Sequence, residues 1–152
     1  MEREEVRAYV NQYCALRDTQ YAAYELCARK HGLTAKELFV LDIIWFAPEG
    51  CLQSEICERL SATRQTISAI VKKFWKLGYL SLTEAEYDRR NKIIRLTEAG
   101  KAYVQEIIPP AAKAENDAMA ELSDKDIVEL VRLTTLFSNC MKRKFEEAVA
   151  RK

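Results

Sequence analysis

The side chains best suited to chemistry with a partner lie on one predicted helix, and that chemistry is hydrogen bonding to base edges. These residues are Thr63, Arg64, Gln65, Thr66, Ser68 and Lys72. Arginine can pair bidentately with guanine and glutamine with adenine, while lysine reaches phosphates. The apolar stripe of the same helix consists of Ile67, Ile70, Val71, Phe74 and Leu77. Because this stripe repeats every three or four residues, we expect it to be buried and the polar set to face solvent.

A predicted hairpin after this helix adds cations. Two β-type runs, residues 79–83 and 93–96, flank a charged segment that contains Asp88, Arg89, Arg90 and Lys92. Residues 61–95 carry eight Lys or Arg against three acidic residues. A polar helix face alone is equally typical of a solvated surface. A donor-rich helix beside a basic hairpin can address a major groove and a phosphate backbone together, and this favours double-stranded DNA as the partner.

Composition excludes several other classes of protein. The chain has 152 residues, 49% hydrophobic and 31% charged, with a net charge of +1, which is typical of one globular domain or one domain with an elaboration. Its charged start and short apolar runs predict no signal peptide and no membrane association, hence a cytoplasmic location. Five cysteines without a CxxC pair, and a single histidine, predict neither a zinc site nor another cofactor.

Catalytic constellations are also missing from the sequence. There is no Ser/His/Asp set, and the four glycines leave little room for a phosphate-binding loop. We therefore expect a binding protein and not an enzyme. A winged-helix protein that contacts only other proteins is the alternative, although such a protein would not need three cations in its hairpin.

The elements that must position the DNA-facing residues can be placed from helix signals. A helical pattern ends near residue 30, and Thr34 with Glu37 forms a capping box before an almost wholly apolar helix at residues 38–46. Residues 53–60 form a short amphipathic helix, and a turn at Ser61 leads to Thr63, a good N-cap. Two helices joined in this way, the second polar outside, predict a helix-turn-helix followed by a wing.

Helices on both sides of this core carry apolar faces that a small protein has little to bury against. One helix is expected from Thr97 to about residue 108, where Pro109 and Pro110 should break or kink it. Another starts at Ser123 and carries a long apolar stripe: Ile127, Leu130, Val131, Thr134, Phe137, Met141 and Phe145. A second copy of the chain is the simplest cover for these faces, and DNA readers of this type bind two half-sites as dimers.

On these residues the chain resembles the MarR family of bacterial transcriptional regulators along nearly its whole length. The resemblance is carried by residues 55–60 and 63–78 of the helix-turn-helix, by Asp88-x-Arg90 in the wing, and by Leu96-Thr97-Glu98-Ala99-Gly100 after it. The wing motif followed by LTxxG is the specific part. Two features depart from the family pattern: Leu52 replaces the usual Ser or Thr N-cap, and the double proline is not general.

The resemblance implies a mainly α fold with a small antiparallel β wing. Residues 34–97 would be the winged helix-turn-helix, and residues 1–33 and 98–152 the helical dimerisation region. It implies a homodimer on a pseudo-palindromic operator, acting as a repressor relieved by a small aromatic ligand or by cysteine oxidation. Arg64, Gln65, Thr66 and Ser68 would read bases with Lys72 toward phosphate. In the wing, Asp88 would orient Arg90, and either Arg89 or Arg90 would enter the minor groove.

Two further sites are predicted in the helices outside the wing. A ligand pocket would be lined by Tyr13, Tyr21, Tyr24, Phe39, Trp45 and Phe46, although an aromatic cluster is more often core than pocket. The alternative to ligand sensing is thiol-based peroxide sensing, for which Cys14 is the candidate. By alignment from Thr34, the sensor cysteine of such regulators would fall one helical turn earlier, near Val10.

Overall fold

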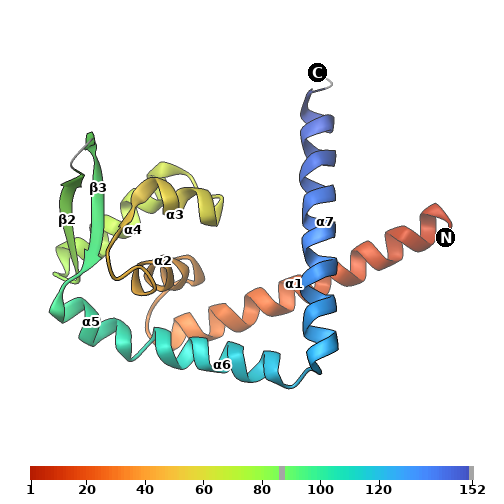
Figure 1. The fold of residues 1–152 in the computed structure, drawn as a ribbon, viewed down its shortest axis with the longest axis horizontal. Helices are drawn as coiled ribbons and strands as arrows, with labels where there is room; N and C mark the ends of the chain where they lie inside the picture. The colour runs from red at the N-terminus through yellow and green to blue at the C-terminus, as the bar shows by residue number, and fades with distance from the viewer. Residues whose placement is uncertain (86–87, 151–152) are drawn as a thin grey trace. The chain divides into compact units, whose positions relative to one another are not determined.

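The computed structural model describes residues 1–85 and 88–150, with only the backbone described for residues 88–90. Two compact units divide the chain, Met1–Ala111 and Ala112–Lys152. The first unit holds α1 (Arg3–Lys30), α2 (Ala35–Trp45), β1 (Cys51–Leu52), α3 (Gln53–Leu60), α4 (Arg64–Lys76), β2 (Leu80–Ala85), β3 (Asp88–Leu96) and α5 (Glu98–Gln105). The boundary falls inside α6 (Ile108–Ala120), and α7 (Asp124–Ala150) lies in the second unit (Figure 1).

The core of the first unit forms around α2, as the apolar run at residues 38–46 predicted. Val40 and Leu41 are fully buried, and Ile56, Ile67 and Phe74 from α3 and α4 join the same cluster. Because the two helices after α2 supply one apolar stripe each, they can pack on it while their polar faces stay in solvent.

Three side-chain contacts fix the start of α2. Glu37 accepts a hydrogen bond from the Thr34 N–H at 3.0 Å, and Thr34 Oγ1 accepts one from the Glu37 N–H at 3.2 Å, which confirms the capping box. Glu25 of α1 accepts from the Ala35 N–H at 3.1 Å. The free N–H groups of a helix start are thus satisfied partly from the neighbouring helix, which joins the end of α1 to α2.

The turn between α3 and α4 is tight, as predicted. Ser61 ends α3 in the left-handed region with φ 47°, and the Thr63 hydroxyl accepts from the Thr66 N–H at 3.2 Å to start α4. Leu52, at the N-cap of α3, has no acceptor in its side chain. The Glu55 carboxylate nevertheless accepts from the Leu52 N–H at 2.7 Å, so half of a capping box remains.

The wing is larger than the sequence predicted. The strands form a three-stranded antiparallel sheet in the order β1-β3-β2. β3 begins at Asp88 and not near residue 93, because pairing continues outward from Thr83↔Ile93 through Glu84↔Lys92 and, after an irregularity, to Ala85↔Asp88. The polar residues of this part resemble a loop in sequence. The two-residue strand β1, which pairs Cys51 with Ile94, was not predicted.

The LTxxG motif joins the end of α4 to the start of α5. Thr97 donates from Oγ1 to the Gly78 carbonyl at 2.6 Å and from N to the Tyr79 carbonyl at 3.0 Å, and it accepts from the Gly100 N–H at 3.0 Å. A Cβ on Gly100 would lie 2.0 Å from the Tyr79 carbonyl oxygen. Only glycine allows this backbone approach, so the motif has a packing role.

The double proline does not end a helix; the expected break lies before it. α5 ends at Gln105, a turn at Glu106 and Ile107 follows, and α6 begins at Ile108. Pro109 and Pro110 therefore occupy the first turn of α6. The N–H groups of a first turn have no partner inside the helix, so a proline there removes no hydrogen bond.

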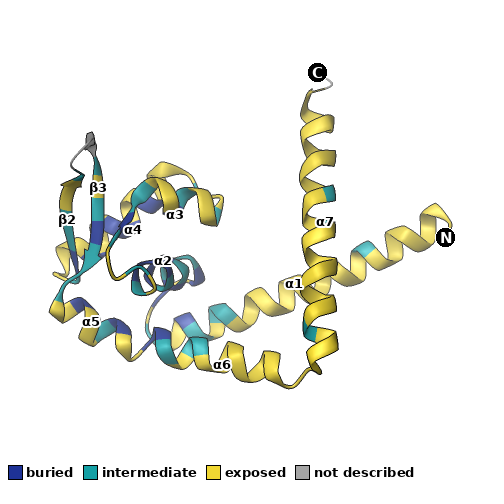
Figure 2. Cartoon of the chain, in the orientation of Figure 1, coloured by how far each residue is buried: buried dark blue, intermediate teal, exposed yellow. Residues whose placement is uncertain are grey.

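α1 and α7 expose their apolar side chains. Only Ala28 is buried in the 28 residues of α1, and α7, which begins after the Ser123 cap as predicted, contains no buried residue. Figure 2 shows both helices as exposed along most of their length. Among the described residues, no helix is both long and apolar enough to cross a membrane.

Candidate nucleic-acid interface

The predicted recognition helix is α4, and most of its predicted stripe is buried. Ile67 and Phe74 are fully buried, with Val71 and Ile70 at 4% and 8% exposure. Leu77 is the exception: it is the C-cap residue and is 55% exposed. Leu77 still has helical backbone angles and its N–H donates to the Lys73 carbonyl, and Gly78, with a φ of 79°, ends the helix directly after it.

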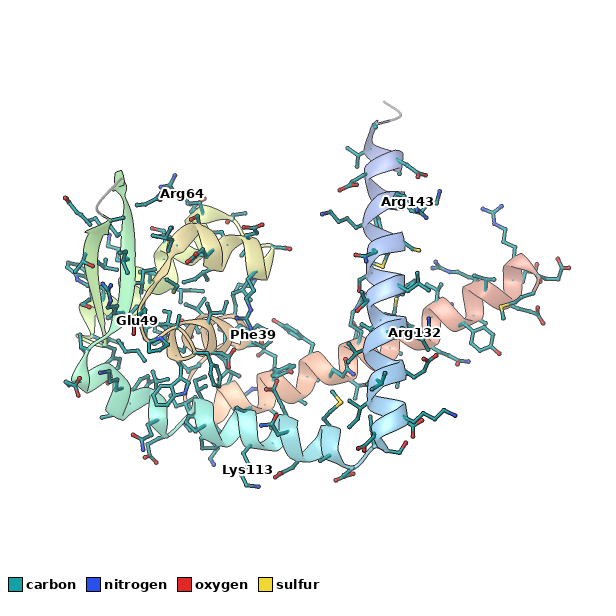
Figure 3. All side chains as sticks on the ribbon, viewed as in Figure 1. Phe39, Glu49, Arg64, Lys113, Arg132 and Arg143 are labelled. Carbon is teal, nitrogen blue, oxygen red and sulfur yellow. The ribbon has the colours of Figure 1, made fainter. Side chains whose placement is uncertain are left out.

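Between α3, α4 and the wing lies a groove of about 610 Å³, called the α4–wing groove below. It is lined by Gln53, Ser54, Cys57, Arg64, Ser68, Val71, Lys72, Trp75, Leu82, Asn91, Lys92 and Ile94. Arg64, Ser68 and Lys72 were predicted from the helix and Lys92 from the hairpin. The fold therefore gathers four of the predicted residues, from two elements, around one opening. In Figure 3 Arg64 lies between the wing strands and α3.

The remaining predicted residues of α4 lie outside the lining of the α4–wing groove. Gln65 and Thr66 are exposed and remain available to a large partner. Thr63 and Thr66 share a hydrogen bond between their hydroxyls at 2.8 Å. Since the Thr63 hydroxyl also accepts the Thr66 N–H, Thr63 is first of all the cap of α4.

Alternation along the wing strands separates two faces of opposite charge. Leu82, Lys92 and Ile94 line the α4–wing groove, whereas their neighbours Thr83, Ile93 and Arg95 line a second cavity of about 590 Å³ on the other face. That second cavity is also lined by Glu49, Glu55 and Glu84. Two cations of α4, Arg64 and Lys72, thus line the groove, whereas the three acids line the other face together with Arg95.

The tip of the wing holds three predicted residues that the structure does not describe in full. Asp88, Arg89 and Arg90 belong to β3, and their side chains lie outside the described part of the chain. The expected orientation of Arg90 by Asp88 therefore stays a prediction. Below the tip, the Arg95 guanidinium donates to the Thr83 hydroxyl at 2.9 Å and links β3 to β2.

Eight of the twelve groove residues were not predicted as site residues, and four of these eight are polar or aromatic: Gln53, Ser54, Trp75 and Asn91. Gln53 is the most informative, because its Nε2 donates to the Arg64 carbonyl at 3.3 Å and so joins the first residues of α3 and α4. Trp75 could have been found from its spacing, since it follows Ser68 by seven residues, or two helical turns. Gln53 carries no such signal, as its contact crosses between helices.

The structure shows ring contacts among three of the predicted ligand-pocket residues. Tyr24 and Tyr21 of α1 meet the Phe39 ring edge-on, with centroid distances of 5.0 and 6.4 Å, and Figure 3 shows Phe39 on the α1 side of α2. Tyr13 lies two turns earlier on α1, while Trp45 and Phe46 lie at the opposite end of α2 from its cap. Neither of the two cavities described above includes any of these six residues.

The cysteines differ in their surroundings. Cys51 is buried, and this burial, with the Glu55 carboxylate nearby, raises the pKa of its thiol to about 11. Cys14 is half-buried on α1 and Cys57 lines the α4–wing groove. Within the described residues no group of three or more His, Cys, Asp and Glu could hold a metal ion.

Comparison with known proteins points to one family. The family model described as "MarR family" matches residues 31–91, which span α2, α3, α4 and most of the wing. The HTH-type transcriptional regulator PapX of Escherichia coli is 33% identical over 93 residues, covering 60% of this chain and 54% of PapX. By these matches the chain is similar to MarR-family regulators, most directly in its winged helix-turn-helix region. It spans about half the length of the curated relatives it matches first.

Solved MarR-type structures share the fold over almost the whole chain. NMB1585, a MarR family regulator from Neisseria meningitidis, superposes with a TM-score of 0.71 at 24% identity, covering 97% of this chain and 99% of that one. The S. aureus MepR–DNA complex gives a TM-score of 0.70 at 18% identity over 87% and 97% of the two chains. The fold of this chain is thus the winged helix-turn-helix with flanking helices that the sequence predicted.

Proposed function

We propose that this chain is a homodimeric, sequence-specific DNA-binding regulator of transcription of the MarR family, acting as a repressor. The observation that carries the proposal is the α4–wing groove, where Arg64, Ser68 and Lys72 of the recognition helix share one opening with Lys92 of the wing. Double-stranded DNA is the partner whose base edges and phosphates match donors and cations in this arrangement. The relatives support the role: several are named transcriptional regulators, and MprA of Escherichia coli is named a transcriptional repressor.

Each part of the site has a separate task in this proposal. The start of α4, with Arg64, Gln65 and Thr66, enters the major groove and reads bases. Lys72 and Lys92 contact phosphates, which sets the register and makes binding depend on salt. The wing, with Asp88, Arg89 and Arg90, grips the duplex beside it. Thr63 acts indirectly, by capping the helix that presents the other residues.

The dimer is proposed from the exposed apolar side chains of α1 and α7. On α1, Tyr9 and Leu16 are 59% and 64% exposed, and on α7 Val131 and Phe145 are 55% and 63% exposed. Contiguous apolar faces of this kind mark surfaces that another protein covers. A second copy is the occupant we propose, because a two-fold dimer would present two recognition helices to a pseudo-palindromic operator.

A signal that alters DNA affinity is part of the proposal. Flat aromatic molecules are the proposed effectors, and the contact of Tyr21 and Tyr24 with Phe39 supports a site there, because it offers an aromatic molecule ring partners. Oxidation of Cys14 is the alternative signal. Titrating DNA binding with aromatic carboxylates and with peroxide, on the wild type and on Cys14→Ser, separates the two: only peroxide sensing is lost in the variant.

Duplex binding is tested with DNA from the region upstream of the coding sequence. Arg64→Ala should lower the affinity for the footprinted site by about 1–3 kcal/mol, the discrimination carried by one bidentate base contact. The matched control is Arg29→Ala, at an exposed arginine near the end of α1, which should leave affinity unchanged. Equal affinity of the wild type and Arg64→Ala, with both folded, would contradict the proposal and favour a protein-binding winged helix.

A further inference from the structure

Trp75 is a large aromatic residue that the proposed base and phosphate contacts leave unused. It lies one residue before the end of α4 and is 50% exposed, although tryptophan is usually well buried. Its position places it in the α4–wing groove with Lys72 of the same helix, and with Leu82 of β2 and Lys92 of β3.

Trp75 and Arg64 lie at opposite ends of α4 and line different parts of the groove. Arg64 lies at the first residue of α4, whereas Trp75 lies near the end, where the chain turns through Gly78 into β2. Leu82, which pairs with Ile94 across the hairpin, lines the groove only seven residues after Trp75. The indole therefore belongs to the end of the groove nearest the base of the wing.

Other contacts in the first unit hold α4 and the base of the wing. The ion pair of Lys73 with Glu37 ties α4 to α2 at 2.7 Å, and Thr97 ties the turn after α4 to α5. The base of the wing is anchored by Leu80 and Ile94, which are buried at 2% and 1% exposure. Beyond this base, apolar contact with α4 has to come from residues of the groove wall, and Trp75 is the largest of them.

We propose that Trp75 is a positioning residue that sets the wing against the recognition helix, so that both reach the same duplex. How rigidly Trp75 holds the wing can be measured in the free protein. The effect of that rigidity on DNA binding rests on the proposed function. Because an indole can pack over a large area while one edge stays in water, Trp75 can hold the strands at the groove without closing the groove to a partner.

The first test measures wing order without DNA. In Trp75→Ala, amide hydrogen exchange in β2 and in the paired part of β3, residues 92–96, should accelerate about tenfold or more, while exchange in α2 stays unchanged. Trp75→Phe should restore most of the protection. Leu77→Ala is the matched control, because Leu77 is 55% exposed at the end of the same helix but does not line the groove. Equal exchange in Trp75→Ala and Leu77→Ala overturns the proposal, whether or not the protein binds DNA.

The second test asks whether Trp75 acts through the wing or touches DNA itself. If it acts through the wing, Trp75→Ala and Lys92→Gln should each weaken duplex binding, and the double variant should lose much less than the product of the two effects. Trp75→Ala should also reduce the salt dependence of binding by about one phosphate contact or more. Multiplicative losses with an unchanged salt dependence would overturn the positioning role and indicate a direct contact.

The two tests fail in different ways. If wild-type protein binds no duplex, the proposed function is contradicted, and the exchange measurement still decides the role of Trp75. If the duplex binds and exchange in the wing does not respond to Trp75→Ala, the positioning role is overturned and the DNA-binding function stands.

Discussion

Lys72 and Lys73 are adjacent on the recognition helix, and nothing in their local sequence separates them, yet they have different roles. Lys72 is exposed in the α4–wing groove, where Arg64 and Ser68 also lie. Lys73 turns the other way, because one residue along a helix rotates by about 100°, and its ammonium pairs with Glu37 at 2.7 Å. The same Glu37 caps α2. The first lysine is therefore available to phosphates, whereas the second holds α4 against α2.

This difference predicts opposite phenotypes for the same substitution. Lys72→Gln should weaken DNA binding and lower the salt dependence by about one phosphate contact, with stability unchanged. Lys73→Gln should leave the salt dependence unchanged and lower the free energy of unfolding by about 0.5–1 kcal/mol, the usual contribution of a partly exposed ion pair. Binding titrations at two salt concentrations and urea unfolding measure both effects. A larger loss of DNA affinity for Lys73→Gln than for Lys72→Gln would contradict the assignment.

Burial of Cys51 gives the protein a pH dependence with a definite sign. The pKa of this thiol is raised from 9.0 to about 11 by desolvation, with a smaller effect of Glu55. The unfolded chain therefore loses the proton first, so stability is full below about pH 9 and falls as pH rises toward 11. Urea unfolding from pH 8 to pH 10.5 should show this fall in the wild type and a smaller one in Cys51→Ala.

The same burial makes Cys51 a poor nucleophile in the folded protein. At pH 8, iodoacetamide should modify the half-buried Cys14 well before the buried Cys51, as peptide mass spectrometry over time would show. Modification of Cys51 first, in protein that is still folded, would contradict the burial and the raised pKa together.

At the scale of elements, the LTxxG motif connects the recognition helix to the helix that leaves the wing. Thr97 bonds to the Gly78 and Tyr79 carbonyls, and the Tyr79 ring stacks on Tyr103 of α5 with centroids 4.3 Å apart. Gly100 lets the backbones approach. The end of α4 and the start of α5 are thus joined at several points, so a displacement of α5 would carry α4 with it.

This connection predicts a large difference between two glycine-to-alanine substitutions. Gly100→Ala should lower the free energy of unfolding by about 3 kcal/mol or more, because its Cβ would meet backbone atoms that cannot move aside. Gly32→Ala is the matched control. Gly32 has open space around it, so an alanine there meets only the strain of a φ of 69°, which costs about 1 kcal/mol. Urea unfolding monitored by circular dichroism measures both. Similar losses in the two variants would contradict a close approach at Gly100.

At the scale of the whole molecule, the helices that flank the winged core expose apolar side chains. α7 has 27 residues and no buried one, yet its sequence has the apolar stripe of a helix that packs. Burial of such side chains is the main favourable contribution to folding and association. Their exposure here agrees with the dimer that we propose, in which a second copy covers them.

A charge on the stripe of α7 should therefore disrupt the dimer. Val131→Asp should shift the protein from dimer to monomer in sedimentation velocity, since an unpaired carboxylate is costly to bury. Its affinity for a two-half-site operator should fall more than its affinity for a single half-site. Lys144→Asp, on the opposite side of the helix by periodicity, is the control. A dimer that tolerates Val131→Asp would contradict the role given to this face.

Features that depend on interactions between residues close together in the sequence could be predicted from the sequence alone. Capping boxes, apolar stripes and turn residues act over three or four residues, so Thr34 with Glu37, the turn at Ser61, the Thr63 cap and most of the buried face of α4 were predicted. Arg64, Ser68, Lys72 and Lys92 were found for the same reason, since each stands in a local pattern of polar residues.

Contacts between distant residues had to come from the tertiary structure. Cys51 becomes part of a strand only because Ile94 lies opposite it. Lys73 is held in an ion pair, and is not available to phosphates, only because Glu37, 36 residues earlier in the sequence, lies beside it. Gln53, Trp75 and the irregular pairing at the top of the wing likewise depend on which elements meet. Local sequence determined the helices and the chemistry that they carry, whereas the packing of those helices decided which side chains share the groove.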